Sequence, residues 1–286
     1  NLYQNIKKMK YAASVVLTVS MFGLADAMNL DLFDPKTVVA KTQFESSAHV
    51  CKPVDVEELR QNGLLTSQDF EDECMLSLFD GMCGGRYMEM GALDGVKFSN
   101  TYAFHKSALN WRGVMVELIP DNYEKLIQNR PDEFANIHGA VCSEPTTLHY
   151  YAGNNNAVGG ILEFASESHK HRWFDDIDIE DTTPISCTPL QNILDVVYDT
   201  QNDKIYFDFF SLDIEGAEMS ALNGIDWERT GFGILIVEKN DPDVEPFLKN
   251  KGYNLVHLPG CSERRNNFYI NPQFDAIYNN VRAKIE

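Results

Sequence analysis

Nearly continuous apolar runs alternate along the chain with stretches whose apolar positions recur at helical spacing. Strands are expected at residues 87–90, 113–117, 135–141, 206–212 and 233–237, and helices at 100–109, 122–129, 189–197, 216–222 and 241–249. A half-exposed strand at 147–151 and a hairpin-like pair at 252–258 and 267–270 are also expected. Such alternation of strands with helices predicts one α/β domain whose sheet is mainly parallel.

The stretch before the first strand has a different pattern. Residues 29–66 mix Asp, Pro, Lys and Ser with little periodicity, which indicates a partly ordered leader. From 67 to 82, acidic residues come first and apolar ones recur at helical spacing, and Gly84 and Gly85 follow. This pattern predicts an N-terminal helix that packs ahead of the first strand and ends at those glycines.

The first 27 residues have the form of a secretory signal peptide. Three lysines precede an apolar stretch from 11 to 24, and Ala25-Asp26-Ala27 supplies a small-residue cleavage site. A membrane anchor is the alternative, but the stretch is shorter than the roughly 20 residues of a spanning helix. Residues 1–8 precede the first methionine, Met9, and are interpreted as upstream translated sequence.

These observations divide the chain into three parts. We expect a signal peptide at 1–27, a leader and helix at 28–82, and the main domain at 83–286. Cleavage after Ala27 would leave the mature protein without a stable membrane span. The expected location is therefore the secretory pathway, in the lumen of the ER or Golgi, or the extracellular space.

A glycine turn follows the first strand of the main domain. The segment Glu89-Met90-Gly91-Ala92-Leu93-Asp94-Gly95 reads as the end of a strand and a tight turn, and Ser99-Asn100-Thr101 could cap the next helix. Open α/β sheets bind their ligands at such turns, although an ordinary surface turn has the same composition. The turn is thus the first candidate ligand site.

The next strand ends in an acid, Glu117, which could accept hydrogen bonds from both hydroxyls of a ribose. The turn lacks the third glycine of a dinucleotide-binding motif and carries Asp94 instead. A carboxylate would repel a pyrophosphate but attracts a cation. S-adenosylmethionine, which carries a ribose, an ammonium and a sulfonium, therefore fits better than NAD.

Six stretches in this order resemble the FkbM-type methyltransferases. They are 89–95 with 98–101, 111–117, 120–123, 187–190, 210–218 and 265–268, and the resemblance spans about residues 86–271. The resemblance implies a Rossmann-like class I methyltransferase fold with a seven-stranded sheet in the order 3-2-1-4-5-7-6, in which only the seventh strand is antiparallel. It also implies S-adenosylmethionine as cofactor and methyl transfer to oxygen, often on a sugar or natural product.

Several strands of the predicted sheet end in an acid, and parallel strands bring such residues to one edge. The candidate cofactor-binding residues are Glu89, Gly91, Ala92, Asp94, Gly95, Ser99, Asn100, Glu117 and Asp213. An acceptor hydroxyl must also lose its proton, which a carboxylate or histidine can take. The candidate catalytic residues are Asp213 at a strand end, Glu215 in the matched motif, and His105.

All six cysteines follow Ala27, and an even number in an exported chain suggests disulfides, with buried free thiols as the alternative. Cys142 follows the third strand and Cys187 precedes a helix, and both lie in or beside stretches that resemble the family. We predict that these two cysteines pair. Cys51 with Cys74 or Cys83 is the next pair to examine. The cysteines form no CxxC pair, so the sequence does not predict a zinc site.

Composition narrows the function further. The net charge of -19 argues against a nucleic-acid partner, because phosphate contacts need clustered Lys and Arg. His169, His171 and the acids of 175–181 could bind a metal, but a solvated loop beside the acceptor pocket is preferred, and no metal is predicted. The expected substrate is a small molecule or glycan, and the oligomeric state stays open. A non-catalytic secreted binding or trafficking protein and an NAD-dependent oxidoreductase are the alternatives.

Overall fold

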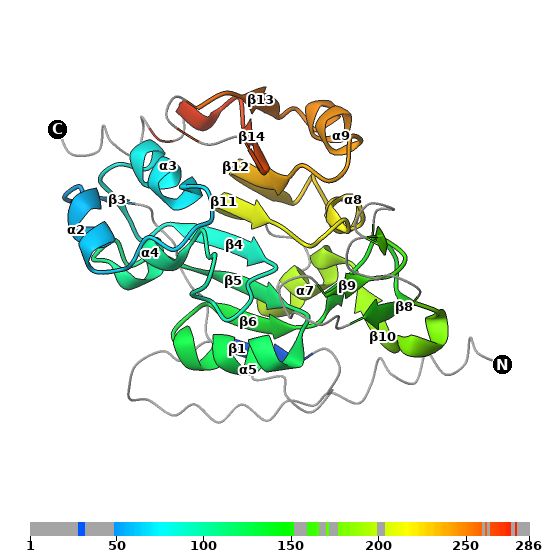
Figure 1. Ribbon diagram of the computed structural model, residues 1–286. Coiled ribbons are helices and arrows are strands. Elements are labelled where there is room, and N and C mark those ends of the chain that lie inside the picture. Colours follow the sequence, from blue (N-terminus) through cyan, green and yellow to red (C-terminus); the bar gives the residue numbers. More distant parts are fainter. Residues whose placement is uncertain are drawn as a thin grey trace, which may run out of the picture.

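The computed structural model describes residues 28–31, 49–151, 159–165, 170–171, 177–198, 204–258, 261, 264–275 and 278. Its main sheet has eight strands in the order β1 (Met28–Asp31), β6 (Ala135–His138), β5 (Arg112–Glu117), β4 (Arg86–Met90), β11 (Ile205–Leu212), β12 (Thr230–Glu238), β14 (Asn266–Ile270) and β13 (Asn254–Val256) (Figure 1). Neighbouring strands are parallel, except that β14 is antiparallel to both of its neighbours.

The sequence predicts seven strands in this sheet, and that count is wrong. β1 comes from the stretch assigned to the leader and adds an eighth strand, because Met28 pairs in parallel with Ala135 at the edge of β6. When the other seven strands are numbered along the chain, they lie in the order 3-2-1-4-5-7-6. The strand that carries the glycine turn, β4, therefore lies in the middle of the sheet.

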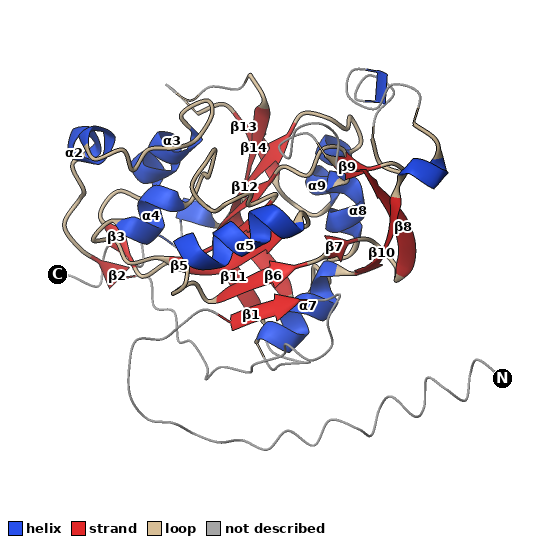
Figure 2. Cartoon of the chain, turned by 60° about the horizontal axis from the view of Figure 1, so that its bottom comes forward, coloured by secondary structure: helices blue, strands red, loops and turns tan. Residues whose placement is uncertain are grey.

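Helices cover both faces of the main sheet (Figure 2). The elements α3 (Glu71–Leu78), α4 (Tyr102–Lys106) and α5 (Pro120–Asn129) pack on one face, and α7 (Leu190–Val197), α8 (Glu218–Asn223) and α9 (Val244–Asn250) pack on the other. Alternate residues of one strand serve the two faces, since Tyr87 packs with the first set of helices and Met88 with the second. Each strand is thus buried on both sides, which explains the nearly continuous apolar runs.

The N-terminal segment differs from its prediction. The helix expected over 67–82 is only α3, because Phe70 has φ +69° and cannot belong to a right-handed helix. Within the leader, α2 (Val56–Gln61) forms, and β2 (His49–Val50) pairs with β3 (Met82–Cys83). None of the described helices is long and apolar enough to cross a membrane. The predicted signal peptide lies outside the described residues.

A second, four-stranded sheet stands beside the main one, in the order β7 (Ala140–Val141), β10 (Thr183–Thr188), β8 (Thr146–Tyr151) and β9 (Gly160–Ile161). The single strand expected over 135–141 is wrong, because the chain leaves the main sheet at Gly139 and β7 joins the second sheet. A short 3₁₀ helix (Ile179–Asp181) leads into β10. The sequence analysis did not predict β10, because polar residues at alternate positions interrupt any apolar run in this strand.

Three disulfides tie these parts together, and they use all six cysteines. Cys142 and Cys187, with α-carbons 5.7 Å apart, join the ends of β7 and β10, so the predicted pair is confirmed. Cys51 pairs with Cys83, one of the two alternatives considered. Cys74 pairs with Cys261, which links α3 to the region after β13 and was not predicted.

Candidate functional site

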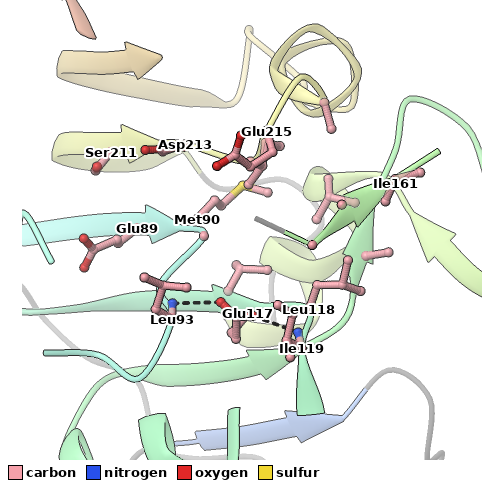
Figure 3. Close-up of a pocket in the computed structure, with 18 of the residues that line it drawn as sticks. Glu89, Met90, Leu93, Glu117, Leu118, Ile119, Ile161, Ser211, Asp213 and Glu215 are labelled. Atoms are coloured by element: carbon pink, nitrogen blue, oxygen red, sulfur yellow. Dashed lines mark hydrogen bonds between the residues drawn. The ribbon is translucent and has the colours of Figure 1, made fainter. Parts of the chain in front are cut away.

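A pocket opens where β4, β5 and β11 end, between the main sheet and β9 (Figure 3). It contains about 1010 Å³ of space, including its open mouth. Its walls include four acids, Glu89, Glu117, Asp213 and Glu215, and the polar residues Gln68, Asn100 and Ser211. The site lies at the carboxyl ends of parallel strands, where open α/β folds bind their ligands.

Glu117 forms the end of β5 and is only 3% exposed. Its two carboxylate oxygens accept hydrogen bonds from the backbone N–H groups of Leu93 and Ile119, each at 2.7 Å (Figure 3). Burial raises the pKa of Glu117 to about 7, despite these hydrogen bonds. The side chain of Asn122 and the N–H of Leu118 also bond to this carboxylate, which is therefore a firmly placed acceptor in the pocket wall.

The glycine turn packs against the end of β11. Gly91 has φ +79°, and a Cβ at this position would lie 1.8 Å from the backbone oxygen of Asp213, so only glycine permits this approach. The N–H groups of Gly91 and Ala92 both donate to the oxygen of Val116 at 3.1 Å. Gly91 lines the pocket, whereas Ala92 is buried behind it. The backbone N–H groups of these two residues thus serve the fold.

Asp94 and Gly95, both predicted to bind the cofactor, lie outside the pocket lining. The Asp94 carboxylate accepts hydrogen bonds from the N–H groups of Val96 and Lys97, at 2.9 and 2.7 Å. The carboxylate that we predicted to contact a cationic ligand therefore bonds to the backbone of its own turn. Gly95 has φ +77° and instead packs against Arg130. The structure therefore corrects the predicted role of both residues.

Glu89 holds the loop that leads to α4. Its carboxylate accepts hydrogen bonds from the Ser99 hydroxyl at 2.8 Å, the Asn100 N–H at 2.7 Å and the Thr101 hydroxyl at 2.5 Å. Burial raises the pKa of Glu89. The predicted capping by the side chains of 99–101 is wrong, because Thr101 caps α4 without a side-chain hydrogen bond. Asn100 alone of these three reaches the pocket, where its amide donates to the Ser211 hydroxyl at 2.8 Å.

Three carboxylates gather on the opposite wall. Asp213, Glu215 and Glu238 each offer an oxygen, and these oxygens lie within 4.8 Å of one another. Burial and the charge of Asp213 raise the pKa of Glu215 to about 7, and the same causes raise the pKa of Glu238 further. Such a cluster can hold protons, an ammonium group or a divalent cation. Glu215 also has φ +57°, a strained conformation for a non-glycine residue.

His105 does not reach the pocket. It is 4% exposed on α4, with its ring nitrogens 3.0 Å from Asp132 and 3.0 Å from Glu133. Burial lowers the pKa of His105. This histidine therefore belongs to a buried ionic cluster behind the pocket wall, and the prediction that it acts as a base is corrected. Asp213 and Glu215, in contrast, both line the pocket. His169 lies outside the described residues.

Several pocket residues were not predicted. They are Gln68, Leu93, Phe98, Leu118, Ile119, Gly139, Ala140, Val141, Gly159, Gly160, Ile161, Ser211, Ile214 and Ala217, together with Met90 and Val116. Most of them follow strand ends or lie in β9, where no periodicity marks them. Phe98 could have been found in the sequence as a large apolar residue beside the glycine turn. In the structure its side chain remains 40% exposed and its φ is +61°. Gln68 comes from the segment before α3.

The fold and pocket together define an α/β protein that binds a ligand at the carboxyl edge of a mainly parallel sheet. The family model described as "Methyltransferase FkbM domain" matches residues 89–255, more than half of the chain. The chain therefore belongs to the FkbM methyltransferase family, and it is an S-adenosylmethionine-dependent methyltransferase. No curated protein shows significant similarity to its sequence.

Solved structures with related folds are distant. The TehB-like SAM-dependent methyltransferase of Corynebacterium glutamicum shares 12% identity, with 76% of this chain and 94% of that chain covered and a TM-score of 0.37. The O-methyltransferase of Bacillus cereus in complex with SAH shares 13% identity, with 77% and 92% covered and a TM-score of 0.30. Similarity at this level carries no information about the substrate of this chain.

Proposed function

We propose that this protein transfers a methyl group from S-adenosylmethionine to a hydroxyl oxygen of a glycan or small metabolite in the secretory pathway. The observation that carries the proposal is the distribution of acids in one pocket, with Glu117 on one wall and Asp213 and Glu215 on the other. A nucleoside with a cationic end matches both walls.

Glu117 would hold the ribose. Its carboxylate lines the pocket at the end of β5 and is held in place by the backbone N–H groups of Leu93 and Ile119. The neighbouring Leu118 and Ile119, with Ala140 and Val141 from β7, provide an apolar wall that suits a flat base. These groups are in place before any ligand binds, which lowers the cost of binding.

The acid cluster would face the cationic end of the cofactor. Asp213 and Glu215 line the pocket, and Glu238 lies behind them. Burial raises the pKa of all three acids, and the charges of neighbouring acids raise those of Glu215 and Glu238 further, so a nearby positive charge would stabilise their ionised forms. When bound, S-adenosylmethionine supplies a methyl group on a positively charged sulfur.

Glu215 would act as the general base, with Asp213 as the alternative. When the methyl group leaves the sulfonium sulfur for the acceptor oxygen, a carboxylate oxygen of Glu215 would take the hydroxyl proton, and the cofactor would be left as a neutral thioether. A pKa of about 7 matches this role, because a base is most effective when its pKa lies near the working pH. The walls of the pocket would hold the acceptor in line with the transferred group.

Two features support the secretory setting. The lysine-rich start with its apolar stretch has the form of a signal peptide. Three disulfides are typical of proteins that fold in an oxidising compartment. Hydroxyl-rich glycans are the abundant acceptors of that compartment, so we place them ahead of other metabolites.

Mass spectrometry of glycans and metabolites from cells with and without the protein tests this proposal. We expect a species heavier by one CH₂ for each methyl transferred, which disappears when Glu215→Gln replaces the native chain. Loss of activity in Glu215→Gln with normal S-adenosylmethionine binding would support the base. Cells whose glycans and metabolites are identical with and without the protein would contradict the proposed reaction.

A further inference from the structure

Arg130 follows α5 and is completely buried, with 0% exposure. Its guanidinium donates through Nε to Glu133 Oε1 at 2.7 Å, through Nη1 to the backbone oxygen of Gly95 at 3.0 Å, and through Nη2 to the Thr101 hydroxyl at 2.5 Å. It touches neither the pocket nor the proposed base. A buried arginine is costly, so its contacts must explain its presence.

Two of these contacts lie within one loop. Gly95 belongs to the glycine turn and Thr101 precedes α4, so one guanidinium joins two points of the loop 91–101. The residues of this loop that line the pocket are Gly91, Leu93, Phe98 and Asn100. The contact is close, because a Cβ on Gly95 would lie 2.7 Å from Arg130 Cγ. Arg130 therefore supports the pocket wall from behind.

The loop needs such support. Leu93 has φ +49° and Phe98 has φ +61°, conformations that L-residues rarely adopt and that persist only where the surroundings fix them. Asp94 and Glu89 fix parts of the loop through their own hydrogen bonds. Arg130 adds a direct link between the turn and the start of α4.

The partners of Arg130 are fixed in turn. Glu133 Oε1 also accepts a hydrogen bond from the Tyr87 hydroxyl at 2.5 Å, and Oε2 accepts one from the Gly113 N–H at 2.7 Å. The guanidinium is thus anchored to β4 and β5, the two strands that lead into the pocket. Buried ion pairs seldom stabilise a fold more than apolar packing does, and their better-supported role is to specify one geometry.

We propose that Arg130 is a positioning residue, which holds the loop 91–101 in the conformation that forms the cofactor pocket. This inference rests on the proposed function only in naming S-adenosylmethionine as the ligand of the pocket. The structural part, that Arg130 orders this loop, can be tested without any ligand.

The test compares Arg130→Met with Arg112→Met in the full chain. Arg112 is a matched control, because it pairs with Asp132 at 2.5 Å and donates to the backbone oxygens of His105 and Trp111, all outside the loop. Hydrogen exchange followed by mass spectrometry reports the order of residues 91–101, and calorimetry reports the affinity for S-adenosylmethionine.

In Arg130→Met we expect exchange in 91–101 to rise at least about tenfold, with β11 and β12 unchanged, and the affinity to fall by about tenfold or more. Arg112→Met should leave both at the wild-type level, and Arg130→Lys should restore part of each. Wild-type exchange in 91–101 of Arg130→Met, or an equal rise across the whole sheet, would overturn the proposal. If the wild type binds no S-adenosylmethionine, the proposed function fails while the exchange result still decides the role of Arg130.

Thr101 provides a milder variant in case Arg130→Met does not fold. Thr101→Val removes one acceptor of the guanidinium, and Thr101→Ser retains it. Faster exchange of 91–101 in Thr101→Val but not in Thr101→Ser is expected. Identical exchange in both would contradict the positioning role.

Discussion

Two polar clusters touch the glycine turn from its opposite ends. At Gly95 the turn meets Arg130, whose charge is paired with Glu133. At Gly91 it meets the end of β11, where Asp213, Glu215 and Glu238 gather. The first cluster contains both signs of charge, and each nitrogen of the Arg130 guanidinium donates a hydrogen bond. The second contains acids alone at its centre.

The pKa values of Glu133 in the first cluster and Glu215 in the second are shifted in opposite directions. Burial by itself would raise the pKa of Glu133, but Arg130, together with His105 and Tyr87, outweighs it and lowers that pKa to about 2. Burial and neighbouring acids raise the pKa of Glu215 to about 7. Folding alone thus completes the first cluster, whereas the second must take up protons or a cation. Carboxylates whose charge the fold does not compensate attract a positively charged cofactor.

The largest effect is expected when the balanced cluster is broken. Glu133→Gln leaves the buried Arg130 without its closest counter-charge, at a cost of about 3 to 5 kcal/mol in the free energy of unfolding. Urea denaturation measures this. Glu73→Gln removes a partner of the half-exposed Arg60 and should cost about 1 kcal/mol or less. Equal losses in the two variants would show that Arg130 is not held as described.

The two clusters should also respond to pH with opposite signs. Glu133 has a lowered pKa, so its contribution to stability is present above pH 4.5 and is lost as the pH falls towards 2. Glu117, Glu215 and Glu218 have pKa values raised from 4.5 to about 7, so the folded state binds more protons than the unfolded state between these values. Their contribution is lost as the pH rises through that window.

Urea denaturation without cofactor should therefore show the highest stability near pH 5 and a fall of several kcal/mol by pH 8. Glu215→Gln should flatten the fall, because the amide does not titrate. Stability that rises steadily from pH 5 to pH 8 would mean that the acid cluster is compensated within the fold.

A smaller effect is expected at the ribose site. Glu117→Ala should weaken S-adenosylmethionine binding by about 1 to 3 kcal/mol, or roughly 5- to 150-fold, because the ribose hydroxyls lose a buried acceptor. Calorimetry measures the affinity, and Glu124→Ala, on the exposed face of α5, is the control. Unchanged affinity in Glu117→Ala would remove Glu117 from the site.

The smallest effect is expected at Asp94. Asp94→Ala should change the affinity by no more than about twofold, because the carboxylate caps a local turn outside the pocket lining and such local bonds contribute little to binding. A loss as large as that of Glu117→Ala would restore the direct role that the sequence predicted for Asp94. Isothermal titration at matched pH separates the two results.

The sequence predicts the features that depend on local pattern. Apolar runs mark the buried strands, and acids at strand ends mark Glu117 and Asp213. Asp94 was assigned to the ligand although it caps its own turn through the N–H groups of Val96 and Lys97. Other partners are distant in the sequence, so His105 was assigned to the reaction although its neighbour in space is Asp132. The second sheet and Arg130 were missed for the same reason, since their partners come from distant parts of the chain.

The central claim is that this pocket binds S-adenosylmethionine between Glu117 and the acid cluster. Calorimetric titration of the full chain at pH 7 with S-adenosylmethionine and, separately, with NAD tests it most directly. We predict saturable one-to-one binding of S-adenosylmethionine and no measurable binding of NAD. Binding of NAD without binding of S-adenosylmethionine, or no binding of either, would contradict the account.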